Sequence, residues 1–231
     1  MPRQSTPSMP SAGSEIRELR KARGLTLKDL QDRTGVSLSY LSAIERGTNK
    51  PSLDVLEAVA KALSVDVNWF FPSRRGTGPM ERAYIVRAEN RRNLNNLYEQ
   101  STQEIGYTDS LLSSSIGGLF YMGIAVYAPG AERPDEPDHV HDGEQHGIVI
   151  KGELEMTLGD EVIILRAGDS YSFDARIPHH GRNRTGQETI LIWGVSPVVI
   201  PKTVERETRG DVPVRVDSDV RLRAKRVRQD R

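Results

Sequence analysis

The chain has 231 residues, 32 Lys or Arg against 32 Asp or Glu, and no cysteine. The length allows one large domain or two small ones. The lack of cysteine excludes disulfides and thiolate metal sites, and it fits the reducing cytoplasm, where we expect the protein to act. No apolar run approaches the ~18–20 residues of a membrane helix. The N-terminal stretch "MPRQSTPSMPSAGS" lacks the apolar core of a signal peptide.

The charge is balanced overall but unevenly distributed. Residues 14–75 carry eleven Lys or Arg against eight Asp or Glu, whereas residues 107–200 carry six against fourteen. Seven of the last seventeen residues are Lys or Arg. This asymmetry indicates parts with different partners, a polyanion for the basic parts, although solvated charges also scatter unevenly without any partner.

The first part of the chain predicts a bundle of short helices. "SEIRELRKARG" has apolar residues at helical spacing, with Ser14 as N-cap and Gly24 as stop. "TLKDLQDRTG" begins at Thr26, with Asp29 three residues later, which is a capping-box pattern. "SLSYLSAIERG" begins at Ser37, "SLDVLEAVAKAL" follows, and "DVNWFF" adds an aromatic turn. We therefore predict four or five helices with tight connections.

The helices of residues 26–34 and 37–46 are joined by "GVS", which is short enough to cross them steeply in a helix-turn-helix. There the second helix enters the major groove of DNA and the helix N-termini face phosphates. An ordinary helical bundle explains the same caps, so the residues alone leave both interpretations open. The candidate DNA-contacting residues are polar and predicted to be exposed. They are Thr26, Lys28, Ser37, Ser39, Tyr40, Ser42, Asn49 and Lys50.

The segment "GVSLSYLSAIERGTNKPSLDVLEAVAKALSV" resembles the phage-repressor-like (Cro/CI, XRE-type) helix-turn-helix family, over about residues 15–71. The resemblance implies DNA binding, with residues 37–46 as the recognition helix. Its serines give short, weakly selective contacts. Specificity is therefore expected from Tyr40, from DNA shape, and from a homodimer that places two heads on a palindromic operator.

From about Ala83, after the linker-like "PSRRGTGPMER", the chain predicts short strands. The β-branched and aromatic runs are "LFYMGIAVYAPG", "GIVIKGELEMTLGDEVIILRAGD" and "ETILIWGVSPVVI". Gly-Asp in "TLGDEVII" predicts a hairpin. Strands without intervening helices predict an antiparallel sandwich or barrel. "RRNLNNLYEQ" is ambiguous, and the chain after Pro201 is too polar to bury much.

The predicted fold class is α+β with two domains, an all-α helix-turn-helix bundle and an all-β barrel. The predicted boundaries are 1–13 for a disordered tail, 14–71 for the DNA-binding domain with its motif at 26–46, 72–106 for a linker, 107–200 for the barrel, and 201–231 for a basic tail.

All five histidines of the chain lie between His139 and His180. Alternate side chains of a strand share a face, so His139 and His141 point the same way. A chelating pair joined by His179 from a distant strand predicts a metal site, if the fold brings the three together. Imidazole suits Zn, Cu, Fe and Ni. The pair on its own is equally consistent with hydrogen-bonded structural histidines.

The spacing around the first histidines resembles the first motif of the cupin superfamily, a double-stranded β-helix barrel. Three residues separate His141 from Gln145, and six residues separate Gln145 from Gly152. The preceding Gly130 departs from the motif, because eight residues rather than five separate it from His139.

The second cupin motif is matched in spacing by Gly168, His179 and Asn183. Asp174 and Arg176 stand where the motif has Pro and Gly. The resemblance covers about residues 115–197 and implies the double-stranded β-helix fold together with a divalent metal site. The implied metal ligands are His139, His141, Gln145 and His179.

Gln145 occupies the position of a glutamate, and a neutral amide brings no charge to a cation. Three arrangements are open. The three imidazoles hold the metal, with Gln145 weak or replaced by water. Glu144 or His146 turns in to ligate. Or the cluster holds no metal and binds an anionic ligand directly. We expect His146 and His180 to be outer groups rather than ligands.

A DNA reader joined to a small ligand-binding barrel is the plan of a one-component transcription regulator, and nearly the whole chain resembles bacterial XRE–cupin regulators. The expected mechanism is a population shift. A small molecule or metal bound in the barrel changes, through the linker, the spacing of the two DNA-binding domains of a dimer. Barrel aromatics either line a pocket or form core or dimer interface. They are Phe120, Tyr121, Tyr127, Tyr171, Phe173 and Trp193.

Two other classes compete with the regulator. Some helix-turn-helix–cupin proteins are mononuclear metal-dependent oxidases or epoxidases, but the Fe(II) facial triad needs a carboxylate, which Gln145 removes. The basic C-terminal tail suggests an architectural DNA binder, although such tails are usually disordered and solvated. We therefore expect a regulator that is not an enzyme.

Overall fold

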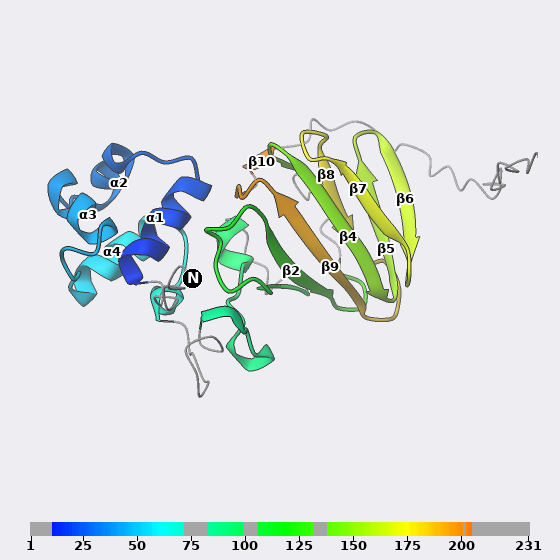
Figure 1. Ribbon diagram of the computed structural model, residues 1–231. Helices are drawn as coiled ribbons and strands as arrows, with labels where there is room; N and C mark the ends of the chain where they lie inside the picture. The colour runs from blue at the N-terminus through cyan, green and yellow to red at the C-terminus, as the bar shows by residue number, and fades with distance from the viewer. Residues whose placement is uncertain (1–10, 72–82, 99–105, 132–137, 201, 205–231) are drawn as a thin grey trace, which may run out of the picture.

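The computed structural model describes residues 11–71, 83–98, 106–131, 138–200 and 202–204. Most of the predicted N-terminal tail, much of the linker and most of the basic tail lie outside these described residues. Figure 1 shows two parts, a group of helices at one end and two layers of strands at the other. Among the described residues, no helix has the length and apolarity needed to span a membrane.

The helical part has the predicted elements. They are α1 (Ala12–Ala22), α2 (Leu27–Thr34), α3 (Leu38–Glu45), α4 (Leu53–Ala62) and the 3₁₀ helix η1 (Val67–Phe70). The capping box between Thr26 and Asp29 is present, and Ser37 caps α3. The predicted cap of α1 is wrong. Ser11 is the cap, because its hydroxyl accepts the N–H of Ser14, and the helix therefore begins within the predicted tail.

A buried ion pair fixes α3 to α1. The Arg20 guanidinium meets both carboxylate oxygens of Glu45, at 2.7 and 2.9 Å, and also donates to the Leu25 carbonyl at 2.7 Å. The apolar sides of the same helices bury Leu19, Leu41 and other core residues around them. These contacts give α3 a fixed direction, which a helix of eight residues does not hold by itself.

The strand part is an antiparallel sandwich, as predicted. One sheet has the order β1-β2-β9-β4-β7 and the other β10-β3-β8-β5-β6. The Gly-Asp hairpin joins β5 to β6, with Leu158 opposite Glu161. The strands are β1 (Tyr107–Leu111), β2 (Tyr121–Tyr127), β3 (Asp138–Val140), β4 (Glu144–Lys151), β5 (Glu153–Leu158), β6 (Glu161–Arg166), β7 (Ser170–Asp174), β8 (His179–Arg182), β9 (Thr189–Ser196) and β10 (Lys202–Val204).

Two segments assigned to the predicted tail and linker contain regular structure. Strand β10 lies inside the predicted tail, because its backbone pairs with β3, and a strand needs only that pairing. The described part of the predicted linker includes η2 (Ala88–Asn90) and η3 (Asn95–Tyr98) and buries Leu94 and Leu97. This segment packs along β1, with Leu94 N–H donating to the Asp109 carbonyl at 2.8 Å.

That segment also contacts the helical part. The Arg92 guanidinium lies 3.0 Å from the Glu15 carboxylate of α1, with both side chains buried, and 5.0 Å from the ring centre of Trp69. Two residues further along the same backbone, Leu94 is paired with β1. Arg92 therefore links the first strand of the sandwich to the first helix of the bundle.

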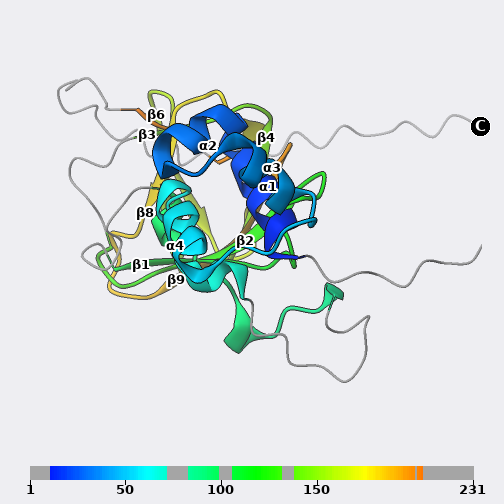
Figure 2. The ribbon, with the colours of Figure 1, turned by 90° about the vertical axis from the view of Figure 1, so that its left-hand side faces the viewer.

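A second set of contacts crosses the same junction. The Ser115 hydroxyl donates to the Glu18 carboxylate at 2.8 Å, and Ile200 N–H donates to the Ala22 carbonyl at 3.0 Å. Figure 2 looks onto the helices with the strands behind them. The C-terminal half of α1 thus has backbone and side-chain bonds to two separate segments of the strand part.

Candidate histidine cavity and DNA interface

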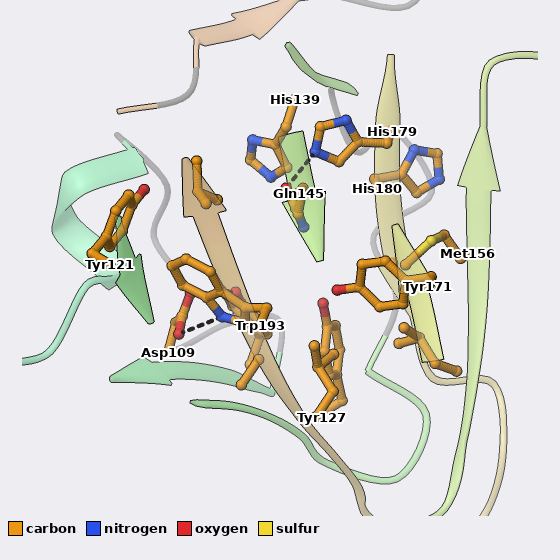
Figure 3. A pocket seen from close by; sticks show the side chains of 16 residues that line it. Asp109, Tyr121, Tyr127, His139, Gln145, Met156, Tyr171, His179, His180 and Trp193 are labelled. Carbon is orange, nitrogen blue, oxygen red and sulfur yellow. Dashed lines mark hydrogen bonds between the residues drawn. The ribbon is translucent and has the colours of Figure 1, made fainter. Parts of the chain in front are cut away.

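A cavity of about 80 Å³ lies between the two sheets (Figure 3). Residues from both sheets line it, and no Lys or Arg is among those described there. It therefore provides no fixed cation for an anionic ligand other than histidine. Its polar and aromatic lining comprises Tyr107, Asp109, Tyr121, Tyr127, His139, Gln145, Tyr171, His179, His180 and Trp193.

Strand pairing gathers the histidines. In the ladder between β3 and β8, His139 lies directly opposite His179. The ring centres of these two residues are 6.2 Å apart, and the ring centre of His141 is 5.5 Å from that of His179. The three imidazoles that we predicted to meet therefore lie in one cluster.

Two of the imidazoles converge on Gln145. Its side-chain oxygen lies 3.0 Å from Nε2 of His179 and 3.2 Å from Nε2 of His141. On the other side of each ring, Nδ1 faces a backbone carbonyl, that of Ile177 at 2.8 Å and that of Asp142 at 3.1 Å. Each ring nitrogen of both histidines thus faces an oxygen.

A neutral imidazole cannot donate at both nitrogens, because it carries only one N–H. Burial lowers the pKa of His179 to about 4, partly offset by the bond to the Ile177 carbonyl, so this ring is neutral at pH 7. With its proton at Nδ1, the Nε2 lone pair points at the Gln145 amide. Either the amide NH₂ group is turned toward the imidazoles, or a cation lies among the three donors.

The His139 imidazole is also neutral near pH 7. Loss of hydration, together with repulsion from a charge on His179, lowers the pKa of His139 to about 4. Neutral imidazole is the form that binds metals. Among the described residues, however, no group of three His, Cys, Asp or Glu side chains is set to hold a metal ion as it stands. The convergent donors are two imidazoles and one amide.

The neighbours of Gln145 face the other way. Glu144 and His146 are exposed on the outside of β4, where they lie 3.2 Å from each other. Their alternation with Gln145 along the strand excludes their turning into the cavity without a flip of β4. His180 is buried, not on the surface, and contacts Asp138 at 2.7 Å. Its other ring nitrogen accepts from Arg182 at 3.1 Å.

The two departures from the second cupin motif compensate each other. Arg176 forms an ion pair with Asp174, and its hydrogen bonds lower the pKa of that carboxyl to about 2. The pair closes the turn that leads into β8. A charged pair thus occupies the two motif positions on the way to His179.

The deep end of the cavity is aromatic and contains one carboxyl group. The Asp109 carboxylate accepts from the Tyr107 hydroxyl at 2.9 Å and from the Trp193 indole N–H at 3.2 Å. Burial nevertheless raises its pKa to about 7. A Cβ atom on Gly123 would overlap the Trp193 ring, so glycine is required for the indole to lie across β2.

The predicted aromatic residues divide between the two interpretations. Tyr121, Tyr127, Tyr171 and Trp193 line the cavity (Figure 3). Phe120 lies outside it and is exposed. Phe173 contacts the His179 ring, with ring centres 4.8 Å apart.

Sequence reasoning missed Tyr107 and Asp109. The alternation of "YTDSL" puts both on one side of a strand, which was the available signal. Without a known partner strand, however, nothing identified that side as the inner one.

Most candidate DNA-contacting residues are exposed around α2 and α3. Thr26, Lys28, Ser37, Ser39, Asn49 and Lys50 are exposed, whereas Tyr40 and Ser42 are half-buried. The Tyr40 hydroxyl donates to the Lys50 carbonyl at 3.3 Å, which fixes the loop after α3.

One exposed cation of this surface was not among the candidates. Arg46 follows α3 and donates to the Ser42 hydroxyl. Its position directly after α3 was the sequence signal that could have identified it as a candidate.

Family comparison decides what the helical and strand parts are. The helix-turn-helix family (HTH_3) matches residues 16–70, and the cupin domain family (Cupin_2) matches residues 123–195. The chain belongs to the helix-turn-helix transcriptional regulators that carry a cupin domain. The fold class and the DNA-binding regulator predicted from sequence are thereby confirmed, and the cupin family supports the barrel fold.

Two relatives of this regulator cover most of it. The HTH-type transcriptional regulator PuuR of Escherichia coli K12 is 26% identical over 80% of this chain and 94% of its own. SutR of the same organism, also an HTH-type transcriptional regulator, is 27% identical over 76% and 88%. Neither named relative is an enzyme.

A solved hydroxypropylphosphonic acid epoxidase from S. wedmorenis is 17% identical, covers 82% of this chain and 100% of its own, and has a TM-score of 0.39. Likeness at this level gives no argument about activity.

The raised pKa of Asp109 predicts an unusual pH dependence of the free energy of unfolding. Its pKa is raised in the folded state, so the folded protein keeps a proton that the unfolded chain loses near pH 4, and stability falls as pH rises from about 4 to 7. From pH 5 to pH 8, metal-free wild type should lose about 2 kcal/mol of unfolding free energy relative to Asp109→Asn. Urea unfolding at both pH values measures this difference. Asp160→Asn, in the exposed β5–β6 turn, should follow wild type, and parallel profiles for all three proteins would contradict the assignment.

Proposed function

We propose that the regulator senses a divalent transition metal, alone or with a small molecule, in the cupin cavity, and that occupancy changes its DNA binding. The observation that carries this proposal is the convergence of the His141 and His179 Nε2 atoms on the Gln145 amide, about 3 Å from its oxygen. Neighbouring donors on one ion are also about 3 Å apart when each bond is about 2.1 Å.

The donor chemistry supports a metal. The backbone carbonyls at Nδ1 hold the imidazole rings of His141 and His179 with Nε2 directed inward, which is how outer groups orient metal-binding histidines. His139 would be the third imidazole and Gln145 a neutral fourth ligand. Zn, Fe, Ni and Cu suit such a set. A bound ion supplies positive charge to a cavity whose described lining has no Lys or Arg.

Coupling to DNA binding would run through the junction between the two parts. The Tyr121 hydroxyl, from the cavity lining, donates to the Val199 carbonyl at 2.9 Å, and the next residue, Ile200, donates to Ala22 of α1. The Asp109 carbonyl accepts from Leu94, two residues from the buried ion pair with Glu15. A ligand that moves Tyr121 or β1 therefore acts on α1, the helix to which α3 is clamped.

On the DNA side, we propose that the exposed residues of α2, α3 and the following loop contact the operator. Lys28 and Lys50 would meet phosphates, whereas Ser39 would face base edges. Because serine side chains make short, weakly selective contacts, one DNA-binding domain alone would select its site poorly. This supports a homodimer that binds a palindromic operator.

Gln145→Glu tests the metal site. A carboxylate adds a negative charge where the amide oxygen meets two imidazoles, so affinity for Zn²⁺ or Ni²⁺ should rise about tenfold or more. Competition with a chromophoric chelator measures this affinity, and elemental analysis of the purified protein checks occupancy. Gln187→Glu, at an exposed position, should leave the affinity unchanged. Equal metal affinity in wild type and Gln145→Glu would argue against the site.

Lys28→Ala and Lys50→Ala test the DNA surface. If each lysine meets one phosphate, each variant should lower the slope of log affinity against log salt by about 1, because one fewer counterion is released. Fluorescence anisotropy with a fragment of the regulator's own upstream region, at several salt concentrations, measures the slope. Lys61→Ala, at an exposed residue of α4, is the matched control and should retain the wild-type slope. Unchanged slopes in the first two variants would remove both lysines from the interface.

A further inference from the structure

The buried Asp109 carboxyl group has only neutral hydrogen-bond partners among the described residues. Asp109 is 1% exposed. Its donors are the Tyr107 hydroxyl, the Trp193 indole N–H and the Ser110 backbone. No Lys or Arg is among the described residues that line the cavity. Buried carboxylates in proteins are paired with a cation as a rule, so the described lining lacks the partner that this carboxylate calls for.

The charge of the cavity selects the charge of its ligand. Burial lowers the pKa of both His139 and His179 to about 4, so neither imidazole offers positive charge at pH 7. Burial also raises the pKa of Asp109 to about 7, which shows that its negative charge is poorly compensated. An anionic ligand would be repelled by this carboxylate. A cationic ligand would compensate the charge and hold the group in its ionised form.

The walls beside Asp109 are aromatic, which also suits a cation. The ring centres of Tyr107 and Tyr127 are 4.7 Å apart, and those of Tyr121 and Trp193 are 5.3 Å apart. In Figure 3 the Tyr127 hydroxyl points into the space between Trp193 and the histidines. Aromatic rings attract organic cations through their negatively charged faces, and a phenol oxygen can accept from an ammonium N–H.

The volume of the cavity limits the ligand to a small molecule. A water-sized group needs about 10–15 Å³ of such a space, so a cavity of about 80 Å³ has room for roughly five to eight non-hydrogen atoms. We propose that Asp109 and the aromatic rings around it bind the ammonium group of a short organic amine. This amine is the small molecule of the proposed function. The proposal rests on that function for the effect on DNA, but not for binding.

An ammonium group at Asp109 would act directly on the route to α1. The Asp109 N–H donates to the Asn95 side chain at 2.7 Å, and the Asp109 carbonyl accepts from the Leu94 N–H at 2.8 Å. Arg92, two residues before Leu94, forms the buried ion pair with Glu15 of α1. The residue that would bind the amine therefore also holds the segment that contacts α1.

Isothermal titration calorimetry of metal-stripped protein with n-butylammonium tests the proposal at pH 8, where Asp109 is ionised. Wild type should bind n-butylammonium about tenfold or more tightly than n-butanol, which has the same size without the charge. Asp109→Asn should lower the affinity for n-butylammonium by about tenfold or more, because it removes the charge and keeps the shape. Asp160→Asn, at an exposed carboxylate, should bind as wild type does. No binding to wild type, or equal affinity in folded Asp109→Asn, would overturn the proposal.

A second measurement needs only wild type. At pH 6 the Asp109 carboxyl is mostly protonated, because its pKa is about 7, whereas n-butylammonium keeps its own proton. Binding should therefore release close to one proton. Titrations in buffers of different ionisation enthalpy measure this release. Binding without proton release would place the amine away from Asp109 and would overturn the assignment.

Competition between the same protein and a chelator for Zn²⁺ separates this proposal from metal sensing. Amine binding to a protein that binds no Zn²⁺ would support the amine site and refute the metal sensor. Zn²⁺ binding without amine binding would refute the amine site and leave the metal sensor standing.

Discussion

The pairing of β3 with β8 is the constraint on which the cupin site depends. It sets His139 directly opposite His179, although the two are far apart in the chain, and His179 meets Gln145 of the other sheet at 3.0 Å. Ile177, just before β8, then fixes the direction of the His179 ring through its carbonyl. Without that register the histidines would be five unrelated side chains, and the cavity would be a small aromatic void.

The amide at position 145 gives this site its character. A carboxylate there would permanently compensate a cation, whereas an amide leaves the lining uncharged apart from Asp109, whose own pKa is raised to about 7. An uncharged lining favours weak, reversible occupancy, which suits a sensor whose response must be released. With Gln145 in the glutamate position, the site also lacks the carboxylate that an iron oxidase of this fold would need, in agreement with the regulator relatives.

Local signals in the sequence predicted local structure well. The caps at Thr26 and Ser37, the Gly-Asp hairpin and the His-x-His spacing each depend on a few adjacent residues, and all are present. What failed depends on partners distant in the chain. Strand β10 forms by pairing with the edge of β3 opposite β8. The described linker segment is held by the contacts of Arg92 with Glu15 and Trp69, and Asp109 faces inward because β1 pairs with β2. None of these partners is visible from local periodicity.

The junction unites the two halves, since a buried ion pair, a side-chain bond and a backbone bond all end on α1. We propose that occupancy of the cavity changes the position of α3 through these bonds. The most direct measurement compares affinity for the upstream DNA of metal-stripped and Zn²⁺-loaded protein, in wild type and in Arg92→Ala. We expect a change of about fivefold or more in the DNA affinity of wild type, and a smaller change in the variant. Equal affinities with and without metal in wild type, where metal binding is confirmed, would contradict it.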